Sequence, residues 1–278
     1  MLYKVRLYQK LEKSVSRLVG LFTLLVSLLY FSKIIAKDPE NARPKKILVL
    51  TIAKAGTHLI EPIVRQITKF EKHKLDFQHI REELLEKSNF DNSFILDHIR
   101  PDYAFLKKDE SDEFIKVVLI RDPRDVLISL IYWMEKKEMA WLTLEQIRAF
   151  NTLPFDERIT QAIKLPDANF GVKWFSKEAV EWAKNPSVFI CKFEDLVGPE
   201  GGGTRQRQEK TIEALAHHLR CSLTAEEIAH IADHAFGNTW TFRKGKIGEW
   251  KSHFKPCHID LFKKTMGNEL IKLGYSEN

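Results

Sequence analysis

Segment 53–58 (AKAGTH) combines small, basic and hydroxyl residues in the spacing of an anion-binding loop. It follows the apolar run KILVLTI and precedes a helical pattern, and Gly56 allows a tight turn between them. Such a turn directs backbone N–H groups and the helix dipole at an anion, while Lys54 and Thr57 add charge-assisted contacts. The segment lacks the GxxxxGK[ST] pattern of nucleotide triphosphatases, which disfavours phosphoryl transfer. Taken alone, it is equally compatible with an ordinary turn between a strand and a helix.

Two later segments have the same character. In segment 121–129 (RDPRDVLIS), Pro123 ends a strand and begins a helix, which leaves Arg121 at the strand tip and Ser129 on the helix. This arrangement suits the binding of one more phosphate. Segment 243–251 (RKGKIGEWK) places two glycines in a basic loop that can wrap around a polyanion. Together, the three segments indicate a ligand with several anionic groups.

In this order, the three segments resemble the motifs of sulfotransferases that use 3′-phosphoadenosine 5′-phosphosulfate (PAPS), specifically the cytosolic aryl and alcohol branch. The family's motifs read roughly PKSGTTW, RxPxDxxxS and RKGxxGxWK, and this chain has AKAGTHL, RDPRDVLIS and RKGKIGEWK. The resemblance covers residues 45–278. It implies an enzyme that transfers a sulfuryl group from PAPS to a hydroxyl of an alcohol, phenol, lipid or glycan. The product would be 3′-phosphoadenosine 5′-phosphate (PAP), and no metal is implied.

The resemblance also implies roles for individual residues. Lys54 would stabilise the departing phosphate oxygen, and Ser129 would be catalytic beside it. His98, in a segment similar to the family's K-T-H-L-P, would be the base, a role that suits histidine because neutral imidazole accepts a proton near pH 7. The cofactor-binding residues implied are Lys54, Ala55, Gly56, Thr57, His58, Leu59, Arg121, Ser129, Phe193, Arg243, Lys244 and Gly245.

Four positions differ from the family's pattern. Ala55 replaces a serine or threonine, Leu59 stands where a tryptophan stacks on adenine, Leu96 replaces a lysine, and Phe193 replaces a tyrosine that reaches the base. The family's dimer motif is not matched at residues 251–260. These differences keep open a second interpretation, a catalytically weak PAP or PAPS binder. A small-molecule kinase on a related fold is the third.

Strand-like and helical patterns alternate along the chain and must position these segments. Apolar runs predict strands at 46–52, 93–98, 114–121 and 187–193, and helical patterns occur at 57–71, 124–137, 174–184, 209–219, 225–235 and 258–273. Thr224 and Glu227 form a capping box at the fifth helix, and the glycine-rich stretch 198–203 predicts a flexible loop. Uninterrupted β-branched runs are typical of strands covered on both faces. We therefore expect a three-layer α/β/α fold with a mostly parallel sheet and a strand-loop-helix like that of P-loop NTPases.

The composition is that of a globular protein, with a basic and hydrophobic N-terminal segment. The 278 residues are 44% hydrophobic and 29% charged, with a net charge of +6. All of this excess lies in residues 1–46, around the uncharged run 18–32, which favours an anionic membrane surface over a nucleic acid. As a helix, residues 18–36 would extend about 28 Å, close to the ~30 Å hydrocarbon core of a bilayer.

We expect residues 1–44 to be a membrane-attachment segment with a linker, and residues 45–278 to be the sulfotransferase domain. A cleaved signal peptide and a helix of the fold are the alternatives.

The remaining features concern the cellular compartment, metal binding and the acceptor pocket. Three scattered cysteines do not form a disulfide framework, which favours a reducing compartment and hence a membrane-associated protein with a cytoplasmic catalytic domain. His230 and His234 stand at i and i+4 without a third ligand, so a helix face is expected there and no metal site. The aromatic residues that could line an acceptor pocket or the core are Tyr132, Trp133, Trp141 and Trp174.

Overall fold

The structure, a computed structural model, describes residues 46–74, 84, 92–107, 114–135, 143–165, 171–236 and 244–277. The chain divides into two units at residues 43 and 44, and all described residues belong to the second. The predicted membrane-attachment segment at 18–36, the linker before residue 45, Trp141 and Arg243 lie outside the described residues.

The centre of the domain is a five-stranded sheet in which every pair of neighbouring strands is parallel. The strands are β1 (Lys46–Thr51), β2 (Glu71–His73), β3 (Ser93–His98), β4 (Ile115–Ile120) and β5 (Val188–Lys192), in the order β2-β3-β1-β4-β5. All residues of β1 and β4 are buried, as the continuous apolar runs predict for strands covered on both faces. The four predicted strands are confirmed, whereas β2 was not predicted because it is short and its sequence, EKH, is polar.

Each helical pattern of the sequence corresponds to a helix. These helices are α2 (Thr57–Thr68), α4 (Pro123–Met134), α7 (Val172–Trp182), α9 (Arg205–His218), α10 (Ala225–Asp233) and α11 (Pro256–Lys272). The sequence analysis did not predict α5 (Leu144–Thr152), α6 (Phe155–Lys164), α8 (Phe193–Leu196) or the 3₁₀ turns η1 (Pro101–Lys107), η2 (Pro199–Gly201) and η3 (Glu249–Ser252).

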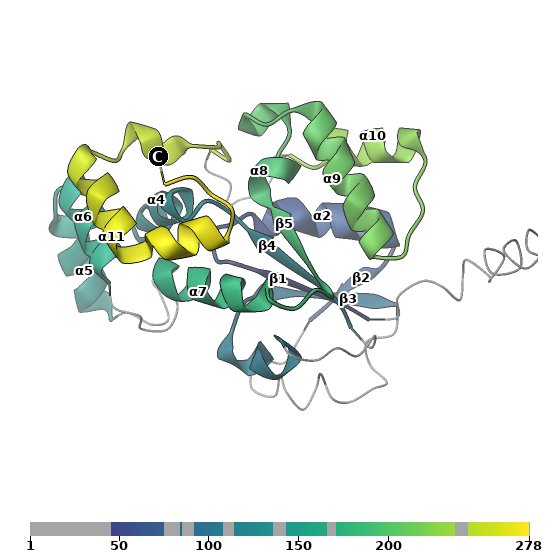
Figure 1. Cartoon of the computed structure of the whole chain (residues 1–278), viewed down its shortest axis with the longest axis horizontal. Helices are drawn as coiled ribbons and strands as arrows, with labels where there is room; N and C mark the ends of the chain where they lie inside the picture. The colour runs from purple at the N-terminus through teal and green to yellow at the C-terminus, as the bar shows by residue number, and fades with distance from the viewer. Residues whose placement is uncertain are drawn as a thin grey trace, which may run out of the picture. The chain divides into compact units, whose positions relative to one another are not determined.

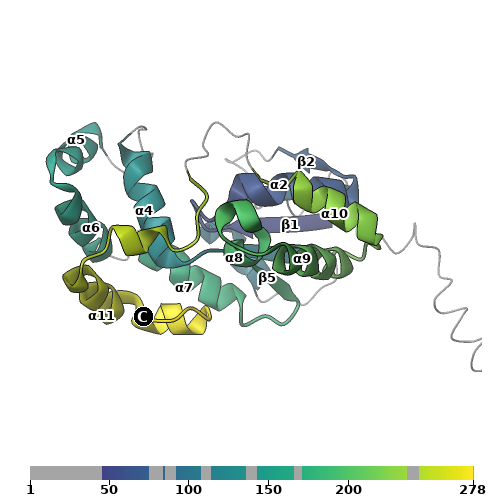
Figure 2. The same cartoon turned by 90° about the horizontal axis from the view of Figure 1, so that it is seen from above.

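The helices form layers on both faces of the sheet, which confirms the predicted three-layer fold. Figure 1 shows α2, α9 and α10 on one face and α7 on the other. Figures 1 and 2 both show α5, α6 and α11 gathered beside α4 to one side of the sheet. The core between the layers contains large side chains with almost no solvent exposure, among them Trp182, Tyr103, Phe94 and Phe262.

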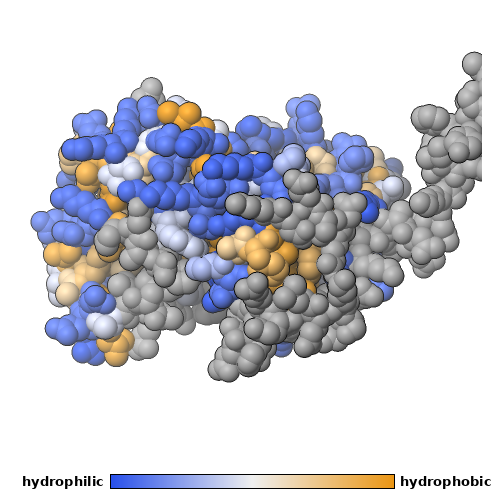
Figure 3. All heavy atoms as spheres, turned by 60° about the horizontal axis from the view of Figure 1, so that its bottom comes forward, coloured by the Kyte–Doolittle hydropathy of each residue, from blue (hydrophilic) through white to orange (hydrophobic). Residues whose placement is uncertain are grey.

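On one face of the molecule, the described side chains are mainly hydrophilic (Figure 3). Figure 3 shows hydrophilic side chains over most of one face, with hydrophobic ones in small groups. The large apolar side chains that are exposed in the described part of the chain are Leu144, Leu165 and Ile271. Within the described ranges, no helix combines the length and the apolar character needed to cross a bilayer.

The capping box predicted at Thr224 gives a direct test of local helix energetics. The Thr224 hydroxyl accepts a hydrogen bond from the Glu227 N–H at 3.2 Å, and Glu227 Oε2 accepts one from the Thr224 N–H at 2.8 Å. Because Thr224 is exposed, Thr224→Ala removes the cap with little loss of packing. It should cost about 1 kcal/mol and lower Tm by about 2–4 °C in a domain of this size. Thr224→Ser is the control, because it keeps the oxygen. Equal thermal stability of the alanine and serine variants would contradict the assignment.

Candidate functional site

The loop between β1 and α2 has the geometry of a phosphate-binding turn. Lys54 (φ 69°) and Gly56 (φ 113°) adopt left-handed backbone conformations, and the Ala55 N–H donates to the Ile52 carbonyl at 2.9 Å. α2 begins at Thr57, and the N–H groups of a first helical turn have no acceptor within the helix. A Cβ on Gly56 would lie 2.8 Å from the Phe193 ring, so glycine is required for both space and conformation. The loop therefore offers N–H groups at a small cradle that suits an oxyanion.

Lys54 connects this loop to the second motif. Its Nζ lies 4.0 Å from the centroid of the Trp133 ring on α4. This contact holds the ammonium over the helix that also carries Ser129. The side chains of Ala55 and Leu59 are buried, with 0% and 9% exposure, so they belong mainly to the core beneath the loop.

His98 lies at the end of β3, directly beside Thr51 at the end of β1. The Thr51 hydroxyl oxygen is 2.9 Å from His98 Nδ1, and the same oxygen is 2.8 Å from the Thr57 hydroxyl. Burial is the main cause that lowers the pKa of His98. The Asp97 carboxylate and a hydrogen bond to the Thr51 backbone oppose this effect, while Arg100 and Lys54 add to it. The imidazole is therefore neutral near pH 7, as a base must be.

The Asp97 carboxylate forms a group of hydrogen bonds next to His98. Its carboxylate accepts hydrogen bonds from the His98 N–H at 2.7 Å, from Arg100 Nε at 3.0 Å and from the Tyr103 hydroxyl at 2.8 Å. Burial together with the Asp97 carboxylate raises the pKa of Tyr103, which keeps its hydroxyl a donor. Leu96 is buried on β3, and the role of Asp97, which follows it, was not predicted from the sequence. The sequence feature that could have indicated this role is the position of the Asp97 carboxylate directly before His98, the candidate base.

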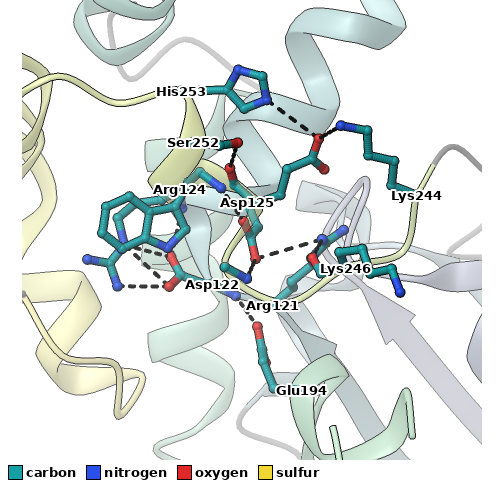
Figure 4. A network of polar contacts seen from close by, with 12 residues as sticks. Arg121, Asp122, Arg124, Asp125, Glu194, Lys244, Lys246, Ser252 and His253 are labelled. Carbon is teal, nitrogen blue, oxygen red and sulfur yellow. Dashed lines mark hydrogen bonds and ion pairs between the residues drawn. The ribbon is translucent and has the colours of Figure 1, made fainter. Parts of the chain in front are cut away.

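Asp125 on α4 ties the second motif to the third (Figure 4). Its carboxylate accepts hydrogen bonds from the N–H groups of Gly248 at 2.8 Å and Trp250 at 2.9 Å, and lies 3.8 Å from Arg121 Nη2. Burial raises the pKa of Asp125, and Arg121 and the two N–H groups partly offset this effect. Arg121 Nη2 also donates to the Lys246 carbonyl at 2.8 Å. One buried carboxylate and one buried guanidinium thus hold the two motifs together.

Arg121 retains hydrogen-bonding capacity in this position. Its Nε is buried and has no hydrogen-bond partner among the described residues. The Phe193 ring lies beneath its guanidinium, with the Cζ atom 4.3 Å from the ring centroid, and is itself only 4% exposed. Ser129 is partly exposed in a stretch, 123–131, whose other residues are buried. The second motif therefore carries both groups that are expected to bind the 3′-phosphate, the guanidinium of Arg121 and the hydroxyl of Ser129.

Asp122 and Arg124 anchor the start of α4. The Asp122 carboxylate caps the helix by accepting from the Arg124 N–H at 2.9 Å, and it pairs with the Arg124 guanidinium at 2.8 Å. Arg124 stacks on the Trp250 ring at 3.9 Å and donates to the Ser276 carbonyl at 2.9 Å. Glu194 accepts a hydrogen bond from the Asp122 N–H at 2.8 Å. Sequence reasoning assigned no role to this pair, although an Asp-Pro-Arg sequence at a strand end is a helix-start signal.

The third motif runs as an irregular loop supported by the glycine-rich stretch. Lys244 is 55% exposed and lies 3.1 Å from Glu249, while Gly245 has a left-handed φ of 57°. The Ile247 N–H donates to the Gly201 carbonyl at 2.9 Å, and a Cβ on Gly201 would lie 2.8 Å from the Gly245 carbonyl oxygen. Stretch 198–203, predicted as a flexible loop, thus includes the turn η2 and is a packed support for the motif.

The histidine pair at 230 and 234 has the expected helical spacing. The two ring centroids lie 4.2 Å apart with the ring planes tilted by 37°, and His234 Nδ1 lies 2.8 Å from the His230 carbonyl oxygen. In the described ranges, no group of three or more His, Cys, Asp or Glu side chains could hold a metal ion.

Comparisons with known proteins identify a family for this chain. The family model for the sulfotransferase domain matches residues 44–274. Sulfotransferase 6B1 of Danio rerio is 25% identical over 182 residues, which are 58% of this chain and 53% of that protein. The match therefore spans about half the length of this curated relative.

Two solved structures share the fold. The crystal structure of mouse sulfotransferase SULT7A1 complexed with PAP has a TM-score of 0.61 at 17% identity, covering 83% of this chain and 87% of that one. Retinol dehydratase in a complex with retinol and PAP has a TM-score of 0.52 at 16% identity, covering 82% of each chain. At these identities, the likeness supports the fold.

The charges around His98 lead to a prediction about its titration. The acid midpoint of His98 should lie below 6.5 in the wild type because burial disfavours the imidazolium. Asp97→Asn removes the charge that raises this pKa and should lower the midpoint further. Arg100→Gln removes a charge that lowers it and should raise the midpoint. Proton NMR titration of the His98 ring measures both. A higher midpoint in Asp97→Asn would show that the carboxylate does not act on His98 as assigned.

Proposed function

The chain belongs to the sulfotransferase family, and from this premise we propose that it transfers a sulfuryl group from PAPS to a hydroxyl of a small-molecule acceptor. The observation that carries the proposal is the buried Arg121, whose Nε has no partner in the described part of the chain and which lies where the second and third motifs join. A buried guanidinium with a free donor suits a phosphate oxygen. PAP, which is present in the two related structures, has two phosphates.

The residues present fit a donor with phosphates at both ends of its ribose. The N–H groups of Gly56, Thr57 and His58 at the start of α2 would hold the 5′-phosphate, with the Lys54 ammonium beside it. Arg121 and Ser129 would hold the 3′-phosphate together with the third-motif residues. Those residues are Arg243, Lys244 and Gly245.

The proposed reaction is a direct displacement at sulfur. The acceptor oxygen attacks the sulfur, an S–O bond forms, and the S–O bond to the phosphate of PAP breaks. His98 Nε2 takes the acceptor proton, and its low pKa keeps the imidazole neutral for this step. The Lys54 ammonium stabilises the negative charge that develops on the leaving phosphate oxygen. Catalysis then consists of positioning and electrostatic stabilisation.

The acceptor is proposed only by class, as an alcohol, phenol, lipid or glycan hydroxyl. Trp133 lies beside Lys54, and Tyr132 packs against Phe155 with ring centroids 5.3 Å apart. An acceptor that reaches the sulfur beside Lys54 would lie close to Trp133. Trp174 packs edge to face on Phe175 on α7.

Thermal stability with nucleotides tests the proposal against a weak binder and a kinase. PAP at 100 times its dissociation constant should stabilise the chain by about 2.7 kcal/mol, whereas Mg-ATP should have no comparable effect.

Arg243→Ala should weaken PAP binding about tenfold or more, because it removes a charge-assisted hydrogen bond to the 3′-phosphate. Binding of adenosine 5′-phosphosulfate, which lacks that phosphate, should be unchanged. A calorimetric titration measures both affinities.

The control is Lys251→Ala, which removes one positive charge from the same segment. Lys251 is exposed and its Nζ lies 5.8 Å from the Trp250 ring centroid. An equal loss of PAP affinity in both variants would indicate a general charge effect. Stabilisation by Mg-ATP and not by PAP would favour the kinase. PAP binding without turnover of any hydroxyl acceptor would favour the weak binder.

We also propose that residues 18–36 attach the protein to a membrane, with the domain 45–278 on the cytoplasmic side. The uncharged run 18–32 flanked by basic residues supports this proposal. The full chain should sediment with phosphatidylcholine vesicles, and more strongly when phosphatidylserine is added, whereas a chain lacking residues 1–39 should stay in the supernatant. Equal behaviour of the two chains would place membrane binding elsewhere or exclude it.

A further inference from the structure

The buried hydroxyl of Thr51 connects the anion-binding loop to the candidate base. Thr51 has 0% exposure, and its Oγ1 lies 2.8 Å from Thr57 Oγ1 and 2.9 Å from His98 Nδ1. Its contact with the Asp97 carbonyl oxygen is 3.4 Å, longer than a typical hydroxyl hydrogen bond. Three side chains therefore form a short chain of hydrogen bonds from the start of α2 to the end of β3.

This chain of hydrogen bonds can point in two directions. A hydroxyl has one hydrogen to donate, and a neutral imidazole carries its proton on one of two nitrogens. In the first direction, Thr57 donates to Thr51 and Thr51 donates to His98 Nδ1, which places the His98 proton on Nε2. In the second direction, His98 Nδ1 donates to Thr51 and Thr51 donates to Thr57. The second direction leaves a lone pair on His98 Nε2, which a base requires.

An anion at the start of α2 selects between the two directions. When a phosphate oxygen accepts the hydrogen of the Thr57 hydroxyl, Thr57 can no longer donate that hydrogen to Thr51. Thr51 then donates to Thr57 and accepts from His98 Nδ1. Because Thr51 has no solvent exposure, bulk water cannot supply a replacement donor.

We propose that Thr51 is a positioning residue that couples donor binding to the protonation pattern of His98. A nucleotide 5′-phosphate at Thr57 holds the His98 proton on Nδ1 through Thr51 and so frees Nε2 for the acceptor. This inference rests on the proposed function, because it needs the nucleotide at the loop. By linkage, the coupling is reciprocal, so the tautomer with the proton on Nδ1 also binds the nucleotide more tightly.

Nitrogen NMR of the full chain with ¹⁵N-labelled histidine measures the His98 tautomer directly, with the resonances assigned from His98→Gln. At about pH 8, where the neutral imidazole dominates, saturating PAP should raise the ratio of the Nδ1–H to the Nε2–H tautomer about fivefold or more. Thr51→Ser keeps the hydroxyl and should keep this response. Thr51→Val has the same shape without the hydroxyl and should abolish it.

The thermal stability of the same samples shows whether PAP binds. It therefore distinguishes a failure of the proposed role of Thr51 from a failure of the proposed function. PAP binding to the wild type without a change of tautomer overturns the role of Thr51 and leaves the proposed function intact. The same tautomer response in Thr51→Val also overturns it. Absence of PAP binding to the folded wild type overturns both. If Thr51→Val does not fold, Thr51→Ala replaces it, and the wild-type response still tests the coupling.

Discussion

The arrangement of the site depends on one buried carboxylate, that of Asp125. Two N–H groups of the third motif and the guanidinium of the second meet on this side chain. A carboxylate taken out of water is costly unless hydrogen bonds and an opposite charge compensate it, and here all its partners come from the two motifs. The loop from Lys244 to Gly248 has no regular secondary structure, so this carboxylate and the Gly201 carbonyl define its path.

The parallel sheet supplies the second constraint, because it brings the ends of different strands to one edge. The register of β1 and β3 pairs Thr51 with His98, which places the loop at residue 52 and the candidate base side by side. β4 lies on the other side of β1 and ends just before Arg121. The chemistry of the site therefore follows from strand order and register as much as from the motifs.

Long, regular patterns were predictable from the sequence, and short or long-range features were not. The strands β1, β3, β4 and β5 were found because each contains three or four consecutive apolar residues. The polar strand β2 carries no such signal, and α8 is a single turn. Helices α5 and α6 carry few buried residues, and their patterns were not recognised.

The motif segments were recognisable by resemblance, whereas the contacts of their neighbours required the structure. Thr51 and Arg124 have partners that only the fold brings near, as when Arg124 meets Ser276. The partners of Asp97 lie within six positions of it in the sequence. Burial of Ala55, Leu59 and Phe193 also could not be read from the motif, because it depends on packing beneath the loop. The roles of the motif residues, Arg243 among them, and of residues 18–36 stay predictions.

The contacts that hold the second motif join residues far apart in the chain, and this has a kinetic consequence. Asp125 meets Trp250 across 125 positions, and Arg124 meets Ser276 across 152. Closing loops of this length costs entropy before any contact compensates it, so contacts of this kind slow folding. A site built from the second and third motifs is therefore complete only when both ends of this span are folded.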